Sequence, residues 1–118
     1  MNRLRSRVDY LATAKGARVV RPGFVLQVAA QPTNAPPRIG FTVSRRVGNA
    51  VARNRVRRRL KEIARIAEHE FQVGSDYVLV GRRAALARKF SGLVNDIYSA
   101  LSRAPKRAPS DPEVGRGA

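Results

Sequence analysis

The sequence predicts a single α+β domain, in which helices pack on one β-sheet. Residues 24–29 and 38–44 alternate apolar side chains with other types, as half-buried strands do, and residues 77–80 form a short apolar run typical of a fully buried strand. Two further segments, 52–67 and 93–101, repeat apolar residues at helical spacing. At 118 residues, the chain is long enough to build one hydrophobic core.

The first predicted element is a short helix near the start of the chain. Residues 6–9 have the spacing of an N-terminal capping box, residues 10–15 follow, and Gly16 is a typical residue at which a helix stops. Residues 19–20 then indicate a weak edge strand.

The segments 24–29 and 38–44 are predicted to pair as antiparallel neighbours, joined by a proline-rich loop that cannot continue the ladder. One face of this pair is apolar and carries Phe24, Leu26, Val28, Ile39, Phe41 and Val43. The opposite face carries Val25, Gln27, Gly40, Thr42 and Ser44. Because these side chains are mostly small or able to hydrogen-bond, the second face could hold an extended ligand strand.

A long, strongly basic helix follows, with Gly48 as a turn residue and Asn49 as its N-cap. Nine of the twenty-one residues from Arg45 to Arg65 are Lys or Arg, against one acid, Glu62. One sector of the helix is apolar and contains Ala52, Val56, Leu60, Ile63 and Ala67. The adjoining arc contains Arg53, Asn54, Arg57, Arg58, Lys61 and Arg65, with Arg55 and Arg59 beyond it. The helix is therefore predicted to pack one side on the core and to present cations on the other.

The rest of the chain adds a turn at 74–76, the buried strand at 77–80 and a final amphipathic helix at 93–101. The domain is therefore predicted to span residues 1–102. Residues 103–118 are dominated by Ala, Pro, Gly and mixed charges, and we predict a disordered tail because such a segment cannot build a core.

The composition favours a polyanionic partner. A net charge of +16 and a pI near 11.8 produce self-repulsion that an anionic ligand would relieve. A membrane surface is disfavoured, because the apolar side of the long helix lacks the bulky residues that enter lipid. The absence of Cys excludes disulfides, and His69 alone cannot build a zinc site. With no long apolar run and no signal-peptide core, the chain is expected to be cytoplasmic.

The basic helix has two readings: a merely solvated charged face, or a phosphate-binding surface. Arg53, Arg57 and Lys61 repel one another at i, i+4 spacing, and a phosphate backbone would relieve that repulsion through guanidinium pairs. If six cations each neutralise one phosphate, the logarithm of affinity should fall with log salt at a slope of about −4 to −5. Tyr10 likewise has two readings, as a core residue or as a platform on which a base stacks.

Residues 40–59 resemble the signature of the bacterial ribonuclease P protein subunit, whose Arg-Asn-Arg helix matches Arg53, Asn54 and Arg55. The resemblance extends over residues 2–102, where the segments 2–4, 9–10, 24–26 and 76–78 follow in the order found in the family. It implies an αβββαβα sandwich with a left-handed crossover carrying the basic helix. It also implies that a partner RNA, using Mg²⁺, hydrolyses precursor tRNA to free the mature 5′ end, so that this chain supplies no catalytic side chain.

The resemblance further implies two binding surfaces. The surface for the catalytic RNA comprises Arg45, Arg46, Arg53, Asn54, Arg55, Arg57, Arg58, Lys61 and Arg65. The surface for the single-stranded 5′ leader of precursor tRNA comprises Tyr10, Val25, Gln27 and Thr42. Ala14 and Gln27 stand where some members have aromatic residues, so leader binding here is expected to rely more on hydrogen bonds and charge. The alternatives are a structural ribosomal protein and a nuclease that acts without RNA; weak self-association is also open.

Overall fold

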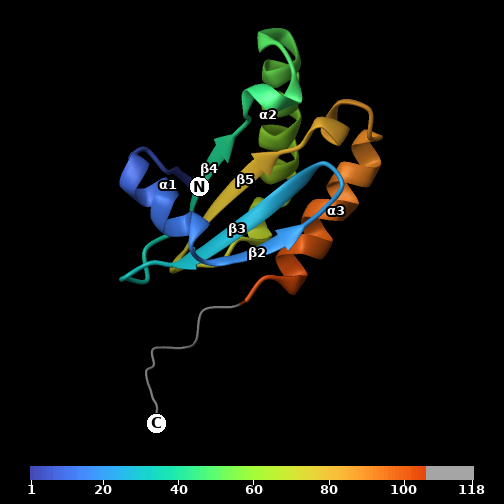
Figure 1. Cartoon of the computed structure of the whole chain (residues 1–118). Coiled ribbons are helices and arrows are strands. Elements are labelled where there is room, and N and C mark those ends of the chain that lie inside the picture. Colours follow the sequence, from blue (N-terminus) through green and yellow to red (C-terminus); the bar gives the residue numbers. More distant parts are fainter. Residues whose placement is uncertain (106–118) are drawn as a thin grey trace.

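The computed structural model describes residues 1–105 and shows a five-stranded sheet with helices on both of its faces (Figure 1). The strands are β1 (Asn2–Arg3), β2 (Ala17–Val20), β3 (Phe24–Ala30), β4 (Arg38–Thr42) and β5 (Ser75–Gly81). The helices are α1 (Arg7–Ala14), α2 (Ala50–Ile66) and α3 (Phe90–Arg103), with short 3-10 turns η1 (Arg45–Val47), η2 (Glu68–Glu70) and η3 (Arg83–Leu86). The α+β class and the αβββαβα order are confirmed, with the short strand β1 added in front. The hand of the β4–α2–β5 crossover stays a prediction.

The strand order, β1-β4-β5-β3-β2, differs from the predicted pairing. β3 and β4 are not neighbours, because β5 lies between them, antiparallel to β3 and parallel to β4. Tyr77, Val78 and Leu79 of β5 are almost fully buried, although they alternate between the two faces. A strand that is apolar on both faces is most stable at the centre of a sheet, where neighbours and helices cover it. The long connection through α2 lets this late strand reach that position.

The turn before α2 begins earlier than predicted, because β4 ends at Thr42. The Ser44 side chain accepts a hydrogen bond from the Arg46 N–H at 3.3 Å and so caps η1. Gly48 has φ +151°, a value that L side chains rarely adopt, and the Asn49 side chain accepts from the Ala52 N–H at 2.9 Å. The predicted turn glycine and N-cap are therefore both confirmed.

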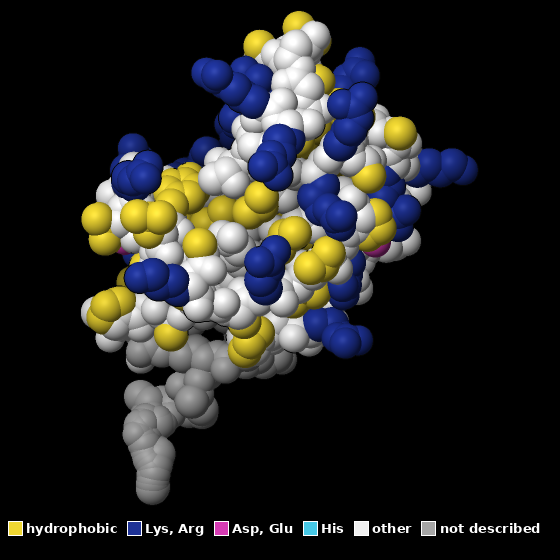
Figure 2. Space-filling model, in the orientation of Figure 1, with side chains coloured by type: hydrophobic (Ala, Val, Ile, Leu, Met, Phe, Trp, Pro, Cys, Tyr) yellow, Lys and Arg dark blue, Asp and Glu magenta, His cyan; other side chains and the backbone are white. Residues whose placement is uncertain are grey.

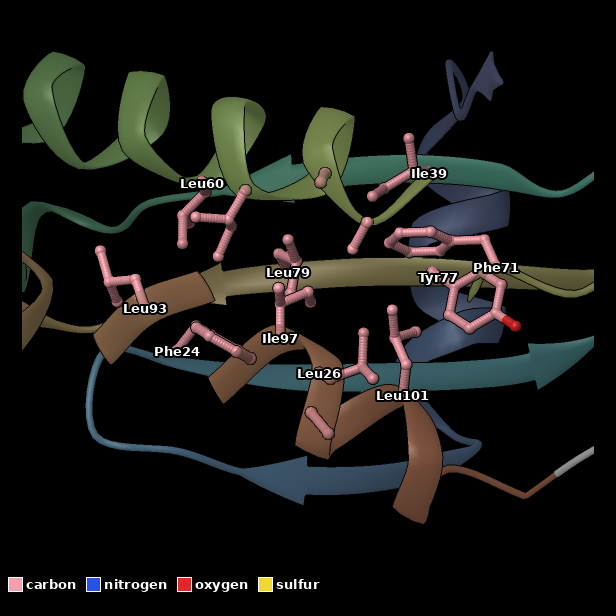
Figure 3. Close-up of a cluster of buried hydrophobic side chains, with 14 of the residues drawn as sticks. Phe24, Leu26, Ile39, Leu60, Phe71, Tyr77, Leu79, Leu93, Ile97 and Leu101 are labelled. Atoms are coloured by element: carbon pink, nitrogen blue, oxygen red, sulfur yellow. The ribbon is translucent and has the colours of Figure 1, made fainter. Parts of the chain in front are cut away.

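α2 and α3 pack on the same face of the sheet and enclose the main core (Figure 3). The predicted apolar sector of α2 is buried at Val56, Leu60, Ile63 and Ala67, whereas Ala52 is half-buried. These side chains meet strand residues such as Leu26 and Leu79 in one layer. Burial of each large side chain stabilises the fold by roughly 1.5–3 kcal/mol. α2 is thus held firmly along one side, which gives its opposite side a defined orientation.

α1 lies on the opposite face of the sheet, over β3 and β5. The Ser6 side chain accepts from the Asp9 N–H at 3.1 Å, which confirms the predicted N-cap. Gly16 follows the helix for a steric reason: a Cβ there would lie 2.0 Å from the carbonyl oxygen of Val28. α1 is short and covers only part of this face.

The last helix runs to Arg103 and Ala104 is buried, so the ordered structure continues past the predicted boundary at residue 102. The rest of the predicted tail, residues 106–118, lies outside the described residues. Among residues 1–105, no helix has both the length and the apolar character needed to cross a membrane.

Candidate nucleic-acid interface

The exposed side of α2 carries four polar side chains around a shallow hollow of about 410 Å³: Asn54, Arg57, Arg58 and Lys61. We call these four residues the basic face of α2. Within residues 1–105, none of its three cations forms an ion pair. The Arg57 guanidinium donates to the Asn54 side-chain oxygen at 3.1 Å, so Asn54 orients a cation without neutralising it. This arrangement leaves three positive charges available to an external anion.

Lys and Arg side chains are spread over the molecular surface seen in Figure 2, where acidic side chains show at only a few points. Many of these cations gather around the protruding part of α2. Arg45 and Arg46 lie exposed on η1, just before this helix. Nine of the 24 Lys and Arg residues thus lie on or just before one helix, an arrangement that favours electrostatic binding of a nucleic acid backbone.

Two of the predicted RNA-binding arginines lie beside this face rather than in it. Arg53 is half-buried and donates from Nη1 to the Gly48 carbonyl oxygen at 3.0 Å, so it also stabilises the turn that precedes α2. Arg55 is exposed and lines a separate hollow of about 380 Å³, together with Val51 and Leu86. The predicted set is therefore spread over more than one side of the helix.

Arg65 differs from Arg57, Arg58 and Lys61 because, within residues 1–105, it has a carboxylate partner. Its guanidinium pairs with Glu62, and the Nε to Oε1 distance is 3.1 Å. This hydrogen bond raises the pKa of Arg65 and lowers the pKa of Glu62. Because the pair is exposed, a phosphate can compete for Arg65, but it must displace Glu62 to do so. Arg65 is thus a weaker candidate than Arg58 or Lys61.

Arg59 points to α3 instead of to solvent. Its guanidinium hydrogen-bonds the Arg88 carbonyl oxygen and lies 5.8 Å from the centre of the Phe90 ring. A cation in this position contributes to the packing of α2 on the start of α3. Of the nine basic residues in 45–65, Arg59 is therefore a structural one.

Arg59→Ala is expected to lower the free energy of unfolding by about 1–3 kcal/mol, because it removes a charged hydrogen bond and a cation–π contact. Chemical denaturation of the purified protein measures this change. Arg58→Ala is the matched control, since Arg58 is the exposed neighbour and should change stability by less than about 0.5 kcal/mol. Equal stability losses in the two variants would contradict the structural role of Arg59.

On the other side of the sheet, Tyr10 of α1 lies directly against β4. A Cβ on Gly40 would come within 2.5 Å of three atoms of the Tyr10 phenol, so glycine is the residue that lets the ring approach the strand. Tyr10 is half-buried. The two readings of Tyr10 are thus combined, since one part of the ring packs on the sheet and the rest borders the part of this face that α1 leaves open.

We call this open part the outer sheet face, and the strand register defines it. Direct partners across the sheet form one row from Arg18 through Gln27 and Val78 to Gly40. A second row contains Val20, Val25, Val80 and Thr42. Gln27 and Thr42 of the predicted leader set are half-buried and lie in these rows beside Tyr10.

Two expectations for the outer sheet face need correction. Val25 is only 8% exposed, so little of its side chain can reach a ligand. The face is also more apolar than predicted, because β5 places Val78 and Val80 between the two strands that were expected to be neighbours. Val78 is only 1% exposed, so it is the half-buried Val80 that offers apolar surface on this face.

Arg18 is a candidate that sequence reasoning missed. It is exposed on β2 and directly opposite Gln27, so its side chain belongs to the same face. With neighbouring strands about 4.8 Å apart, Arg18 lies roughly 14 Å across the sheet from Gly40 and the Tyr10 ring. The alternation of β2 would have indicated Arg18 only once the partner strand and register were known.

Among residues 1–105, no three His, Cys, Asp or Glu side chains come together in a way that could hold a metal ion. The lone His69 lies near Tyr98 and Glu70 at the end of α2. The described residues therefore do not fit a metal site.

The sequence matches a known family model and is similar to individual proteins. The family model described as Ribonuclease P matches residues 1–105. A ribonuclease P protein component from Gluconacetobacter diazotrophicus is 45% identical over 108 residues, which cover 90% of this chain and 93% of the relative. One from Paramagnetospirillum magneticum is 43% identical over 109 residues, covering 87% and 82%.

Solved structures show the same fold. The ribonuclease P protein of Thermotoga maritima superposes with a TM-score of 0.75 at 25% identity, covering 90% of this chain and all of the other. The protein of Staphylococcus aureus superposes with a TM-score of 0.73 at 23% identity, covering 86% of this chain and 94% of the other.

Proposed function

The chain belongs to the ribonuclease P protein family, a component of an endonuclease ribonucleoprotein, and from this premise we propose that it binds two RNAs through two surfaces. The basic face of α2, with Arg45, Arg46, Arg53, Arg55 and Arg65 around it, binds the catalytic RNA. The outer sheet face binds the single-stranded 5′ leader of precursor tRNA. The observation that carries the proposal is the set of unpaired cations on a helix whose other side is anchored in the core.

Phosphate groups are the ligands that best match the basic face. The guanidinium groups of Arg57 and Arg58 can each bind a phosphate with two parallel hydrogen bonds, and Lys61 adds a point charge one turn away. Each contact releases condensed counterions from the RNA, which favours binding at low salt. Because α2 is already held by the core, little additional ordering of its backbone is needed when the RNA binds.

The outer sheet face suits a single strand better than a duplex. Tyr10 offers an aromatic surface for one base, the half-buried Val80 offers apolar surface on the same face, and Gln27 offers an amide for a base edge. Stacking and hydrogen bonding to unpaired bases are the usual means of binding single-stranded RNA. This face is separated from the basic face of α2 by the sheet, so the protein can hold two RNA segments at once.

In this proposal, the RNA partner performs the hydrolysis with Mg²⁺, and the protein screens phosphate repulsion between catalytic RNA and substrate. The side chains of this chain bind and position RNA; none of them transfers a proton or attacks the phosphodiester. The expected consequence is a larger stimulation by the protein at low Mg²⁺, where the RNA alone is least able to offset its own charge.

A reconstitution experiment tests the function. The purified protein is mixed with the cognate catalytic RNA and a 5′-extended precursor tRNA at low Mg²⁺, and cleavage at the mature 5′ end is measured. Stimulation that depends on the catalytic RNA supports the proposal. RNA binding without stimulation would favour a structural ribosomal role, and cleavage by the protein alone would favour a free-standing nuclease; either result contradicts the proposal.

Arg18 is expected to contribute a phosphate contact to leader binding. Arg18→Ala should weaken binding of precursor relative to mature tRNA by about threefold and should lower the salt slope of precursor binding by about 0.7. Filter binding to the assembled complex over a range of salt concentrations measures both. Arg103→Ala, which removes an exposed arginine from the last turn of α3, should leave the ratio unchanged. A lower ratio in both variants would indicate a general charge effect.

A further inference from the structure

Three charged side chains join α1 to the sheet. Arg38 of β4 binds Asp76 of β5 through two hydrogen bonds, from Nε to Oδ1 at 2.9 Å and from Nη2 to Oδ2 at 2.7 Å. Its remaining nitrogen, Nη1, donates to Oδ2 of Asp9 in α1 at 3.3 Å. One guanidinium therefore connects two neighbouring strands with the helix above them.

Arg38 is held more firmly by Asp76 than by Asp9. The Asp76 side chain is only 9% exposed and holds Arg38 with both oxygens, which is the main cause of the raised pKa of Arg38. The side chains of Arg38 and Asp9 are each 31% exposed, and they share a single hydrogen bond. Asp76 thus fixes the guanidinium on the sheet, and the guanidinium in turn holds α1.

Apart from the Tyr10 ring, α1 has few side chains that fix its position on the sheet. It is eight residues long, and its two large aliphatic side chains, Val8 and Leu11, are 74% and 51% exposed. Thr13 is its one buried residue, and the Thr13 hydroxyl bonds back to the Asp9 carbonyl within the same helix. A helix with so little apolar burial depends more than usual on its polar links.

The position of α1 determines the position of Tyr10. Tyr10 follows Asp9 directly, and its ring rests on Gly40, two residues after Arg38 on the same strand. We propose that Arg38 is a positioning residue for the leader site: anchored by Asp76, it holds Asp9 and thereby keeps the Tyr10 ring at the border of the outer sheet face. Arg38 and Asp76 do this without touching the RNA. The inference rests on the proposed binding of the leader by this face.

A double-mutant cycle between Asp9→Asn and Tyr10→Ala tests the inference in the assembled complex with catalytic RNA. The readout is the ratio of affinities for precursor and mature tRNA, which reports on the leader alone. Asp9→Asn should lower this ratio by about threefold to tenfold when Tyr10 is present. In the Tyr10→Ala background it should have little further effect, because the effects of mutations at coupled residues are not additive. Asp9→Asn also removes a negative charge, which by itself would strengthen RNA binding, so a loss cannot be a simple charge effect.

Asp96→Asn is the matched control. Asp96 of α3 pairs with Arg88 through two hydrogen bonds, on the opposite face of the sheet from α1, so the variant makes the same chemical change in another carboxylate–guanidinium pair. It should leave the affinity ratio unchanged. Amide hydrogen exchange provides a second readout: exchange over residues 10–14 should become severalfold faster in Asp9→Asn and not in Asp96→Asn.

The outcomes separate the two proposals. If Tyr10→Ala lowers the ratio but Asp9→Asn does not, the positioning role of Arg38 is wrong and leader binding by the outer sheet face stands. Equal losses from Asp9→Asn in the presence and absence of the Tyr10 ring would also overturn the positioning role. If Tyr10→Ala itself leaves the ratio unchanged, leader binding by this face is wrong and the inference falls with it.

Discussion

Replacing Arg58 and Lys61 together by Ala is expected to weaken binding of the catalytic RNA by about tenfold to thirtyfold at 0.1–0.2 M salt. Both side chains are exposed and neither has an acidic partner among residues 1–105, so their charges are available to phosphates in the free protein. Each lost phosphate contact should also reduce the slope of log affinity against log salt by about 0.7–0.9. Titration of labelled catalytic RNA with protein at several salt concentrations gives both quantities.

The Glu62–Arg65 pair offers an internal control on the same helix. Arg65→Ala removes one cation that Glu62 already neutralises, so it should weaken RNA binding less than Arg58→Ala alone. Glu62→Gln should have the opposite sign and strengthen binding, because it releases Arg65. Thermal unfolding should be nearly unchanged in all of these surface variants.

Two results would contradict the assignment of the basic face. One is an Arg58→Ala/Lys61→Ala variant that binds the catalytic RNA as the original protein does. The other is equal weakening by Arg58→Ala and Arg65→Ala, which would show that total charge matters and that the location of the charges on α2 does not.

Tyr10→Ala is expected to weaken binding of precursor tRNA by about fivefold to hundredfold while leaving binding of mature tRNA unchanged, because one stacked base contributes about 1–3 kcal/mol. Only the precursor carries the leader, so the difference between the two substrates isolates the outer sheet face. Equilibrium binding of both RNAs to the assembled complex measures the effect.

Gly40→Ala examines the same site from the strand side. The new Cβ would lie 2.5 Å from the Tyr10 ring, which must move because the strand backbone cannot. We expect a loss in the same direction as for Tyr10→Ala and smaller in size. Tyr10→Phe is the control that keeps the ring and removes the hydroxyl. A loss as large for Tyr10→Phe as for Tyr10→Ala would rule out stacking as the main contribution of this residue.

The division of α2 into a buried side and a basic side could be read from the sequence. Helical periodicity depends on residues a few positions apart, and the burial of Val56, Leu60 and Ile63 follows from it directly. The caps at Ser6 and Asn49 are equally local, since each side chain bonds a backbone N–H three residues later. The resemblance in residues 40–59 added the order of the elements.

The arrangement of the sheet depends on contacts between distant segments, which local patterns do not encode. The predicted pairing of 24–29 with 38–44 follows the usual preference for sequence neighbours, but β5 enters between them from more than thirty residues away and brings Val78 and Val80 to the outer sheet face. The place of Arg18 opposite Gln27 required the register of β2 on β3, and the approach of Tyr10 to Gly40 required the packing of α1 on the sheet.

The charges of α2 also depend partly on the sequence and partly on the fold. By itself, the sequence determined that this helix is basic on one side, because that property follows from composition and helical period. Only the tertiary structure decided which cations are free. Arg59 turns to Phe90 of α3, whereas Arg58 and Lys61 remain open to solvent. The reason is physical: the charge of a side chain is set by its chemistry, but its availability to a ligand is set by the groups that the fold places around it.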